Sequence, residues 1–164
     1  MLGPFIPVRR GKKGTYLNDW STLTSEQLEK ESADNNGGNV GLRLDNYASI
    51  DPDSQAARDI VDTWEREGKL PPTVAWKTAS GAIRRLFKTI PGIERLEIKS
   101  INLDLRHGPG FYDIIPPSFV FDPKKGLKGD YQWVKDLSPD DIEPSPLPIG
   151  ILEYFKKHSS AFKN

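Results

Sequence analysis

The chain of 164 residues contains no cysteine and only two histidines, His107 and His158. Without cysteine the protein has no disulfide, no cysteine-ligated zinc and no thiol nucleophile, and two histidines exclude a multi-histidine zinc site. The lack of disulfides fits a reducing compartment, so we expect a cytoplasmic protein. These absences leave carboxylates as the candidate ligands for any metal ion.

An excess of charge of one sign and long apolar runs are also missing. Lys plus Arg number 23 and Asp plus Glu number 23, so any attraction to nucleic acid must come from local clusters. No apolar run approaches the roughly 20 residues of a membrane span, and no signal-peptide core is present, so we expect no membrane partner. The 36% hydrophobic content is ordinary for a globular protein. We therefore expect one domain over residues 1–164, with a proline-rich connector and a C-terminal helix in 144–164.

The motif Ile50-Asp51-Pro52-Asp53, together with the acid of Leu103-Asp104-Leu105, suggests a metal site. Alternate residues of a strand point to one face, so Asp51 and Asp53 can present two carboxylates side by side. A third carboxylate from a neighbouring strand would complete an all-oxygen site for Mg²⁺ or Mn²⁺. On spacing alone, the alternative is a turn leading into the next helix, since Asp, Pro and Ser all favour turns.

The patterning predicts an α+β protein with a mixed, largely antiparallel sheet. Helices are expected where apolar residues recur at helical spacing: a short one opening at Thr24-Ser25, one over 55–67 capped by Ser54, and one over 149–157. Strands are expected at 40–44 and 47–53 as a hairpin, at 73–78 and 83–88, at 95–100 and 101–105, at 111–115, and at 132–134. We expect a basic loop at 9–14, a loop at 107–110 and a turn at 126–131.

Several motifs, taken in order, resemble the N-terminal domain of bifunctional DNA primase/polymerases, a branch of the archaeo-eukaryotic primase superfamily. They are Arg10-Gly11-Lys12-Lys13 with Trp20, Asn39-Val40-Gly41-Leu42-Arg43, Ile50-Asp51-Pro52-Asp53-Ser54, Thr78-Ala79-Ser80-Gly81, Asp104-Leu105-Arg106-His107-Gly108, Pro116-Pro117-Ser118 before Tyr131-Gln132-Trp133, and Leu147-Pro148. Each motif alone is weak, but their order and distances over nearly the whole chain make the resemblance specific.

The resemblance implies a palm-like sheet of the RNA-recognition-motif type beside a smaller αβ unit, with the active site in the cleft between them. It implies template-dependent nucleotidyl transfer, taking ribo- or deoxyribonucleoside triphosphates and a single-stranded DNA template or primer. Asp51, Asp53 and Asp104 match the family's three acids and would hold two Mg²⁺ or Mn²⁺ ions. Such domains act in replication of a plasmid, phage or other mobile element, usually beside a helicase module.

Two departures from the family pattern stand out. Pro52 replaces an aliphatic residue, and because proline cannot donate to a ladder, its strand should lie at an edge or end there. The usual phosphate-binding histidine after Ser-Gly falls on Arg84, or on Arg85 if one residue is inserted. Arginine can hold a triphosphate bidentately, so this substitution is compatible with nucleotide binding. Adjacent strand residues face opposite ways, so at most one of Arg84 and Arg85 can enter the cleft.

Other residues have both a functional and an ordinary interpretation. Ser80 and Gly81 would bind phosphate through a hydroxyl and backbone N–H groups, or form a plain hairpin turn. Arg106 would brace the acids or the nucleotide, or form a structural ion pair. His107 would serve near the nucleotide, or be a loop histidine without a chemical task. Asp113 is an unusual acid within an apolar strand, and an edge location of that strand is the only explanation that the sequence offers.

Two basic clusters are candidates for contact with template phosphates, or are solvated surface. One contains Arg9, Arg10, Lys12 and Lys13; the other contains Lys124, Lys125 and Lys128. Tyr131 and Trp133 could stack on bases, but a core position is favoured for both, because the resemblance places them beside Pro116-Pro117.

The leading hypothesis is a primase-polymerase catalytic domain, and the main alternative is a catalytically decayed primase-like module that binds nucleic acid. A rolling-circle initiator would need a His-x-His metal set, which the chain lacks. A metal-dependent nuclease remains open, because the same acids can activate water.

Overall fold

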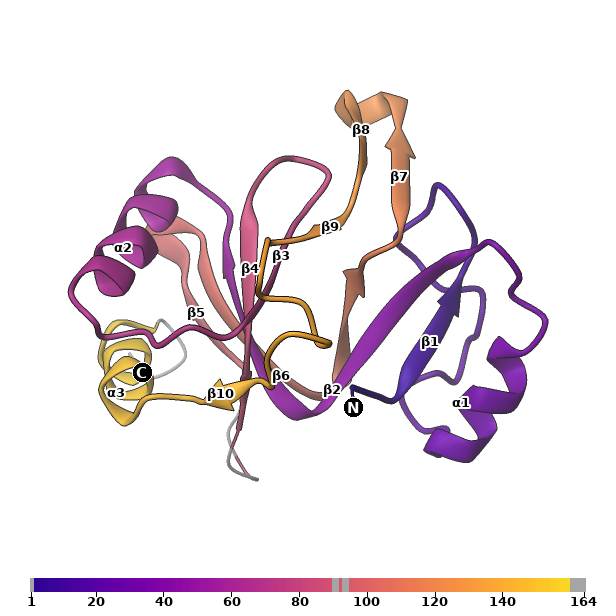
Figure 1. Ribbon diagram of the computed structural model, residues 1–164, viewed down its shortest axis with the longest axis horizontal. Helices are drawn as coiled ribbons and strands as arrows, with labels where there is room; N and C mark the ends of the chain where they lie inside the picture. Colours follow the sequence, from indigo (N-terminus) through magenta and orange to yellow (C-terminus); the bar gives the residue numbers. More distant parts are fainter. Residues whose placement is uncertain (1, 90–91, 93–94, 160–164) are drawn as a thin grey trace.

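The computed structural model describes residues 2–89, 92 and 95–159 and shows an α+β fold (Figure 1). The helices are α1 (Ser25–Ser32), α2 (Gln55–Arg66) and α3 (Ile149–His158). The main sheet contains β1 (Phe5–Val8), β2 (Asn39–Pro52), β3 (Val74–Lys77), β4 (Ile83–Lys88), β5 (Leu96–Ile98), β6 (Leu103–Ile115), β9 (Gln132–Trp133) and β10 (Ser145–Pro146). A separate pair, β7 (Phe119–Asp122) and β8 (Leu127–Asp130), projects from the body of the molecule (Figure 1).

The main sheet is mixed and largely antiparallel, as expected. Its strand order is β5-β6-β2-β4-β3-β9, with β1 added beside β2 and β10 beside β4. Of the pairings described, β10 with β4 is parallel and the others are antiparallel. None of the helices in the described ranges is long and apolar enough to cross a membrane.

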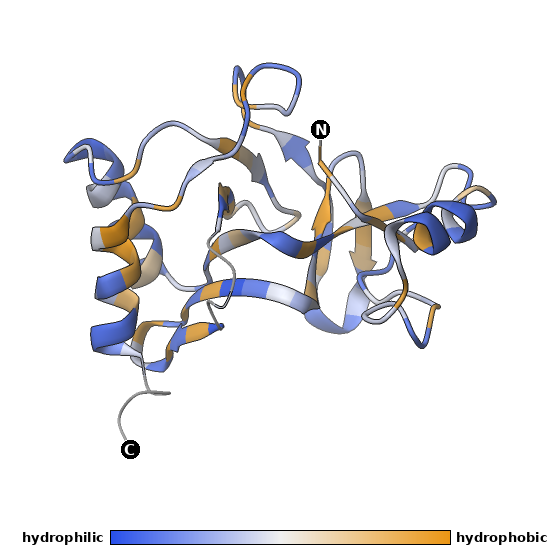
Figure 2. Ribbon diagram, turned by 90° about the horizontal axis from the view of Figure 1, so that it is seen from below, coloured by the Kyte–Doolittle hydropathy of each residue, from blue (hydrophilic) through white to orange (hydrophobic). Residues whose placement is uncertain are grey.

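Two hydrophobic cores lie at opposite ends of the long strands β2 and β6. One core packs β1, α1, β3 and the first half of β2; the other packs α2 and α3 against the second half of β2 and the first residues of β6. Apolar residues are concentrated in these buried stretches, whereas the projecting loops are mostly hydrophilic (Figure 2). Strands β2 and β6 thus connect the two packed units.

The predicted hairpin between 40–44 and 47–53 is wrong, because both segments belong to the single strand β2. Asp45 and Asn46 fall where the register of β2 against β6 shifts, between Leu44 and Ala48. Such an irregularity bends and twists a strand without reversing it. Turn-favouring residues therefore mark a bend here, which lets one strand serve both cores.

Three other expectations need correction. Residues 107–110 belong to β6 rather than to a free loop, and the predicted strand 95–100 is reduced to β5, followed by a 3₁₀ helix at Lys99–Ile101. The predicted turn at 126–131 is mostly strand β8, which pairs with β7 around a short 3₁₀ helix at Pro123–Lys125. The β3–β4 hairpin, α2 and the end of β2 at Pro52 are confirmed.

Ser54 fixes the junction between β2 and α2. Its hydroxyl oxygen accepts the N–H of Ala57 at 3.0 Å, which caps the helix, and the hydroxyl donates to the Ile101 carbonyl. Ala57, Val61 and Trp64 are the buried residues of α2, and they pack in the second core. Because Asp53 directly precedes this cap and donates its N–H to the Asn102 carbonyl at 2.9 Å, its backbone is tied to the start of β6.

Gly41 allows the Tyr112 ring to lie close against β2. A Cβ at this position would come within 2.7 Å of the Tyr112 ring. The Tyr112 hydroxyl donates to the Lys13 carbonyl and accepts the N–H of Thr15, each at 2.9 Å. The ring thus anchors the basic loop to the central strands.

We expect Gly41→Ala to displace Tyr112 and destabilise the fold by about 1–3 kcal/mol, the usual cost of overpacking. Gly14→Ala is the matched control, because a Cβ at Gly14 has open space around it. Urea unfolding of both variants measures the difference, and equal stabilities would contradict the packing role of Gly41.

Candidate active site

Three carboxylates lie in register across neighbouring strands. Asp51 of β2 pairs with Asp104 of β6, and Asp104 pairs with Glu97 of β5. Directly opposite residues of antiparallel strands point to the same face, with Cα atoms about 4.5–5.5 Å apart. Asp53 follows at the end of β2, and all four acids line one pocket of about 260 Å³. The face concerned is the one that α2 and α3 leave uncovered.

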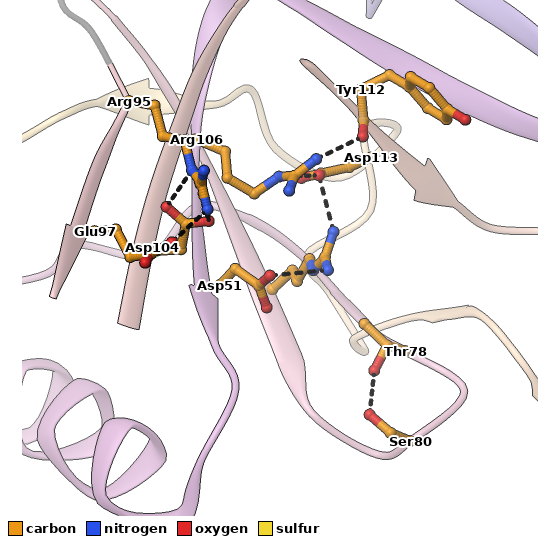
Figure 3. A network of polar contacts seen from close by, with 10 residues as sticks. Asp51, Thr78, Ser80, Arg95, Glu97, Asp104, Arg106, Tyr112 and Asp113 are labelled. Atoms are coloured by element: carbon orange, nitrogen blue, oxygen red, sulfur yellow. Dashed lines mark hydrogen bonds and ion pairs between the residues drawn. The ribbon is translucent and has the colours of Figure 1, made fainter. Parts of the chain in front are cut away.

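Arg95 lies against Asp104 in this pocket. Its Nε is 3.0 and 3.1 Å from the two carboxylate oxygens of Asp104, and its Nη2 is 2.8 Å from Oδ2 (Figure 3). The same Nη2 donates to Glu97 at 2.6 Å. The guanidinium also lies 5.6 Å from the centre of the Phe111 ring. One cation therefore neutralises two acids of the row.

A second arginine lies against Asp51. Arg84 of β4 donates from Nη2 to Asp51 at 3.1 Å and from Nη1 to Asp113 at 2.8 Å. Asp113, whose side chain is fully buried, also accepts from Arg106 Nε at 2.9 Å (Figure 3). Arg106 in turn donates to the Tyr112 carbonyl at 2.9 Å. Asp113 is thus the shared anchor that holds two arginines on the face of the acids.

Burial and neighbouring charges together set the pKa values of Asp51 and Arg84. Desolvation raises the pKa of Asp51, and Asp113 adds to the rise, whereas Arg84 and Arg106 oppose it. Desolvation alone would lower the pKa of Arg84, but Asp113 and Asp51 outweigh it and raise that pKa. Arg84 stays charged, and a further cation beside Asp51 would favour the ionised form of that carboxylate.

A second pocket of about 360 Å³ adjoins the acidic one, and Arg106 lines both. Its cations are Lys13, Arg84 and Arg106. Its aromatic walls are Trp20, Phe111, Tyr112 and Tyr131. Three cations suit a polyphosphate, and aromatic rings suit a base or sugar, because anions need countercharge and flat rings need stacking surface.

Lys13 brings the basic loop to this pocket. Desolvation lowers the pKa of its ammonium, Arg84 and Lys125 lower it further, and Asp51 and Asp53 act in the opposite direction. The side chain therefore lies within electrostatic reach of both pockets. An incoming anion would relieve the repulsion between Lys13 and Arg84.

Two predicted nucleotide-binding residues point away from this site. Arg85 donates to Glu65 at 2.7 Å and lies 3.4 Å from Asp62, both on α2. His107 is buried, with Nδ1 2.7 Å from the Tyr47 carbonyl. Both alternate with cleft-facing neighbours, Arg84 and Arg106, so the pleat turns them to the helical side. As strand alternation predicts, Arg84 and Arg85 face opposite sides of β4.

Ser80 and Gly81 form the tight turn between β3 and β4. Gly81 has a φ of +93°, and its N–H donates to the Thr78 carbonyl at 2.9 Å. The hydroxyls of Ser80 and Thr78 are 3.0 Å apart, and no bond drawn in Figure 3 joins this pair to the arginine network. The turn is an ordinary hairpin turn that exposes a hydroxyl, and its phosphate contact stays a prediction.

The residues fit a hard cation in type and register, but arginines engage oxygens of Asp51 and Asp104. Within residues 2–89, 92 and 95–159, no three His, Asp or Glu side chains converge as metal ligands do. Arg84 holds Asp51 and Arg95 holds Asp104, so two carboxylates that a metal would need are paired with arginine. Asp51, Asp53 and Asp104 share one pocket of oxygen donors, so the site fits Mg²⁺ or Mn²⁺ once those ion pairs open.

The sequence alone does not identify three members of this site, which are Arg95, Glu97 and Asp113. The sequence pattern predicts a strand over Arg95 and Glu97 but no role for them, and their place beside Asp104 follows only from the β5–β6 register. Alternation along Leu96-Glu97-Ile98 does indicate one polar residue facing away from a core. The partners of Asp113 lie 29 and 7 residues away in sequence, and no local pattern identifies them.

Comparison with known proteins gives one family. The family model described as "Bifunctional DNA primase/polymerase, N-terminal" matches residues 3–148. No curated protein matches the chain.

We expect Arg95→Ala to tighten Mn²⁺ binding about fivefold, because the variant removes a cation that competes for Asp104 (roughly 1 kcal/mol for a partly exposed ion pair). Arg66→Ala, on the exposed side of α2, is the control for loss of one positive charge. Electron paramagnetic resonance of free Mn²⁺ measures the affinity without any turnover. Weaker Mn²⁺ binding by Arg95→Ala than by the wild type would contradict the competition.

Proposed function

The chain belongs to the bifunctional DNA primase/polymerase family, and from this premise we propose that it is a metal-dependent nucleotidyltransferase that makes primers or extends DNA on a template. The observation that best supports this proposal is the row of acids beside a pocket lined by cations and aromatic rings. In this proposal residues 1–164 act as one catalytic domain in replication of a plasmid, phage or other mobile element, beside a helicase module.

The proposed palm is the sheet portion made by β2, β4, β5 and β6, with α2 and α3 behind it. The proposed smaller unit is the first core, built around β1 and α1. Lys13 and Trp20 come from that smaller unit, whereas Arg84 and Arg106 come from palm strands, and all four line the same pocket. A nucleotide in this pocket would therefore contact both units.

Asp51, Asp53 and Asp104 would hold the divalent ions. Two Mg²⁺ or Mn²⁺ ions, when bound, would supply charge neutralisation for the attacking 3′-hydroxyl and the leaving pyrophosphate. Arg84 and Arg106 would bind the triphosphate, with Asp113 fixing both guanidiniums in place. Ser80 and Gly81 would add a hydroxyl and backbone N–H groups from the β3–β4 turn. The rings of Trp20 and Tyr112 pack edge to face with their centroids 4.7 Å apart, and they would exclude water from one side of the nucleotide pocket.

In this proposal Arg84 stands where the family has a histidine, but it does not act as a proton donor. Its guanidinium stays protonated at working pH, so it can stabilise charge but cannot donate a proton to the leaving group. The proposed rate enhancement therefore comes from positioning and electrostatics.

The second candidate is a primase-like module that binds nucleic acid without catalysis. The closed ion pairs of Arg84 with Asp51 and Arg95 with Asp104 favour it, because they satisfy the acids without a metal. Calorimetry separates the two candidates: the catalytic domain binds a triphosphate more tightly with Mn²⁺, and the binding module shows no such dependence.

We expect Asp51→Asn and Asp104→Asn each to lower Mn²⁺-dependent extension of a primed template at least about 100-fold, since each removes a charge that the transition state uses. Asp34→Asn, exposed beyond α1, is the matched control. Circular dichroism verifies that the variants fold. Wild-type rates in both site variants would refute the assignment of the acids.

The raised pKa of Asp51 predicts a pH dependence of cation binding. A raised pKa means that Asp51 takes up a proton while ordinary aspartates are still ionised, and the protonated form cannot bind Mn²⁺. Mn²⁺ affinity should therefore begin to fall, as the pH is lowered, before ordinary aspartates protonate. Titrations at stepwise lower pH measure this, and constant affinity throughout that range would contradict it.

A further inference from the structure

The two basic clusters, separate in sequence, form one surface. We define the arm as residues 119–130 and the basic loop as residues 9–14. The N–H of Gly11 donates to the Phe119 carbonyl at 2.9 Å, and the N–H of Phe121 donates to the Gly11 carbonyl at 3.0 Å. The buried Asn39 side chain joins them again, donating to the carbonyls of Lys12 and Phe119 at 2.8 and 2.7 Å. The arm and the basic loop are therefore held side by side.

Positive charge is concentrated on this surface although the whole chain has none in excess. The arm and the basic loop carry seven cations against two acids, Asp122 and Asp130. The seven are Arg9, Arg10, Lys12, Lys13, Lys124, Lys125 and Lys128, and all are exposed. A local excess of this kind attracts a polyanion.

Exposed aromatic rings accompany these cations. The side chain of Phe121 is 50% exposed on the arm, directly opposite Lys128 in the β7–β8 register. Tyr16, 39% exposed, lies under the guanidinium of Arg9 at 5.2 Å. An exposed phenylalanine between lysines is unfavourable for stability, but it suits stacking on an unpaired base.

The arm also approaches the catalytic cleft. A Cβ on Gly129 of β8 would come within 3.0 Å of the Ala79 carbonyl, so the arm packs against the β3–β4 turn. Lys125 lies close enough to Lys13 to lower its pKa, and Lys13 lines the pocket that also contains Arg84. Cations thus continue from the tip of the arm into the cleft.

We propose that the arm and the basic loop together bind a single-stranded nucleic acid, the template strand, with Phe121 stacking on a base and Lys124 and Lys125 contacting phosphates. This inference rests on the proposed function for the identity of the strand, but the binding needs no metal. Single-stranded rather than duplex nucleic acid is the expected ligand, because bases inside a duplex have no free face for Phe121.

The test uses the full chain in EDTA with fluorescein-labelled oligothymidylate of about 20 nucleotides, long enough for a strand-tracking groove, and fluorescence anisotropy as the readout. Phe121→Ala should weaken single-strand binding about tenfold, as expected for loss of one stacked base. Its control is Phe5→Ala, a 38% exposed ring in a different pocket with Leu2 and Trp133. A labelled duplex should bind Phe121→Ala and wild type equally.

The lysines are tested by salt dependence. Lys124→Gln with Lys125→Gln should reduce the slope of log affinity against log salt by about 1.4, or about 0.7 for each lost phosphate contact to a single strand. The matched control is Lys156→Gln with Lys157→Gln, an adjacent exposed pair on α3. Circular dichroism confirms folding of each variant.

The outcomes separate this inference from the proposed function. Unchanged single-strand affinity in Phe121→Ala and in the lysine variant overturns the inference, even if primer extension is observed. Equal loss for duplex and single strand overturns the stacking role and indicates a duplex-binding arm. Selective single-strand loss supports the inference, even if the wild type extends no primer.

Discussion

The repulsion among carboxylates on one face of adjacent strands is the constraint on which this site depends. Register places Glu97, Asp104 and Asp51 in a row, with Asp53 at its end. Like charges so close raise the free energy of the folded chain unless cations lie between them. Arg95 and Arg84 provide those cations in the structure described here. The acids are thus kept together on one face, and a divalent ion that enters must replace guanidinium contacts.

Arg84 links the two pockets, because it contacts Asp51 in one and lines the other. Asp113 holds Arg84 from behind, so the guanidinium keeps one partner when it exchanges Asp51 for a phosphate. A metal that neutralised Asp51 would release one side of Arg84 for an anion. Cation and triphosphate binding would then support each other, as expected of a nucleotidyltransferase in the primase/polymerase family.

The sequence predicts those parts of the arrangement that depend on local geometry, such as the alternation of side chains along a strand. The common face of Asp51 and Asp53, the opposite faces of Arg84 and Arg85, and the Ser54 cap of α2 all follow from short-range geometry. The rest depends on non-local pairing. Asp45 and Asn46 have the composition of a turn but lie at a bend of β2, because two cores hold both halves of the strand extended. Gly11 contacts Phe119, and Glu97 lies beside Asp104, only because distant segments pair in a particular register. A short stretch of sequence does not contain that information.

The most direct test of the account is anomalous diffraction from crystals soaked with Mn²⁺ and a non-hydrolysable deoxyribonucleoside triphosphate. We expect manganese peaks bounded by Asp51, Asp53 and Asp104, with Arg95 withdrawn from Asp104 and the phosphates against Arg84 and Arg106. Manganese and phosphates bound elsewhere, with Arg95 still paired to Asp104, would contradict it.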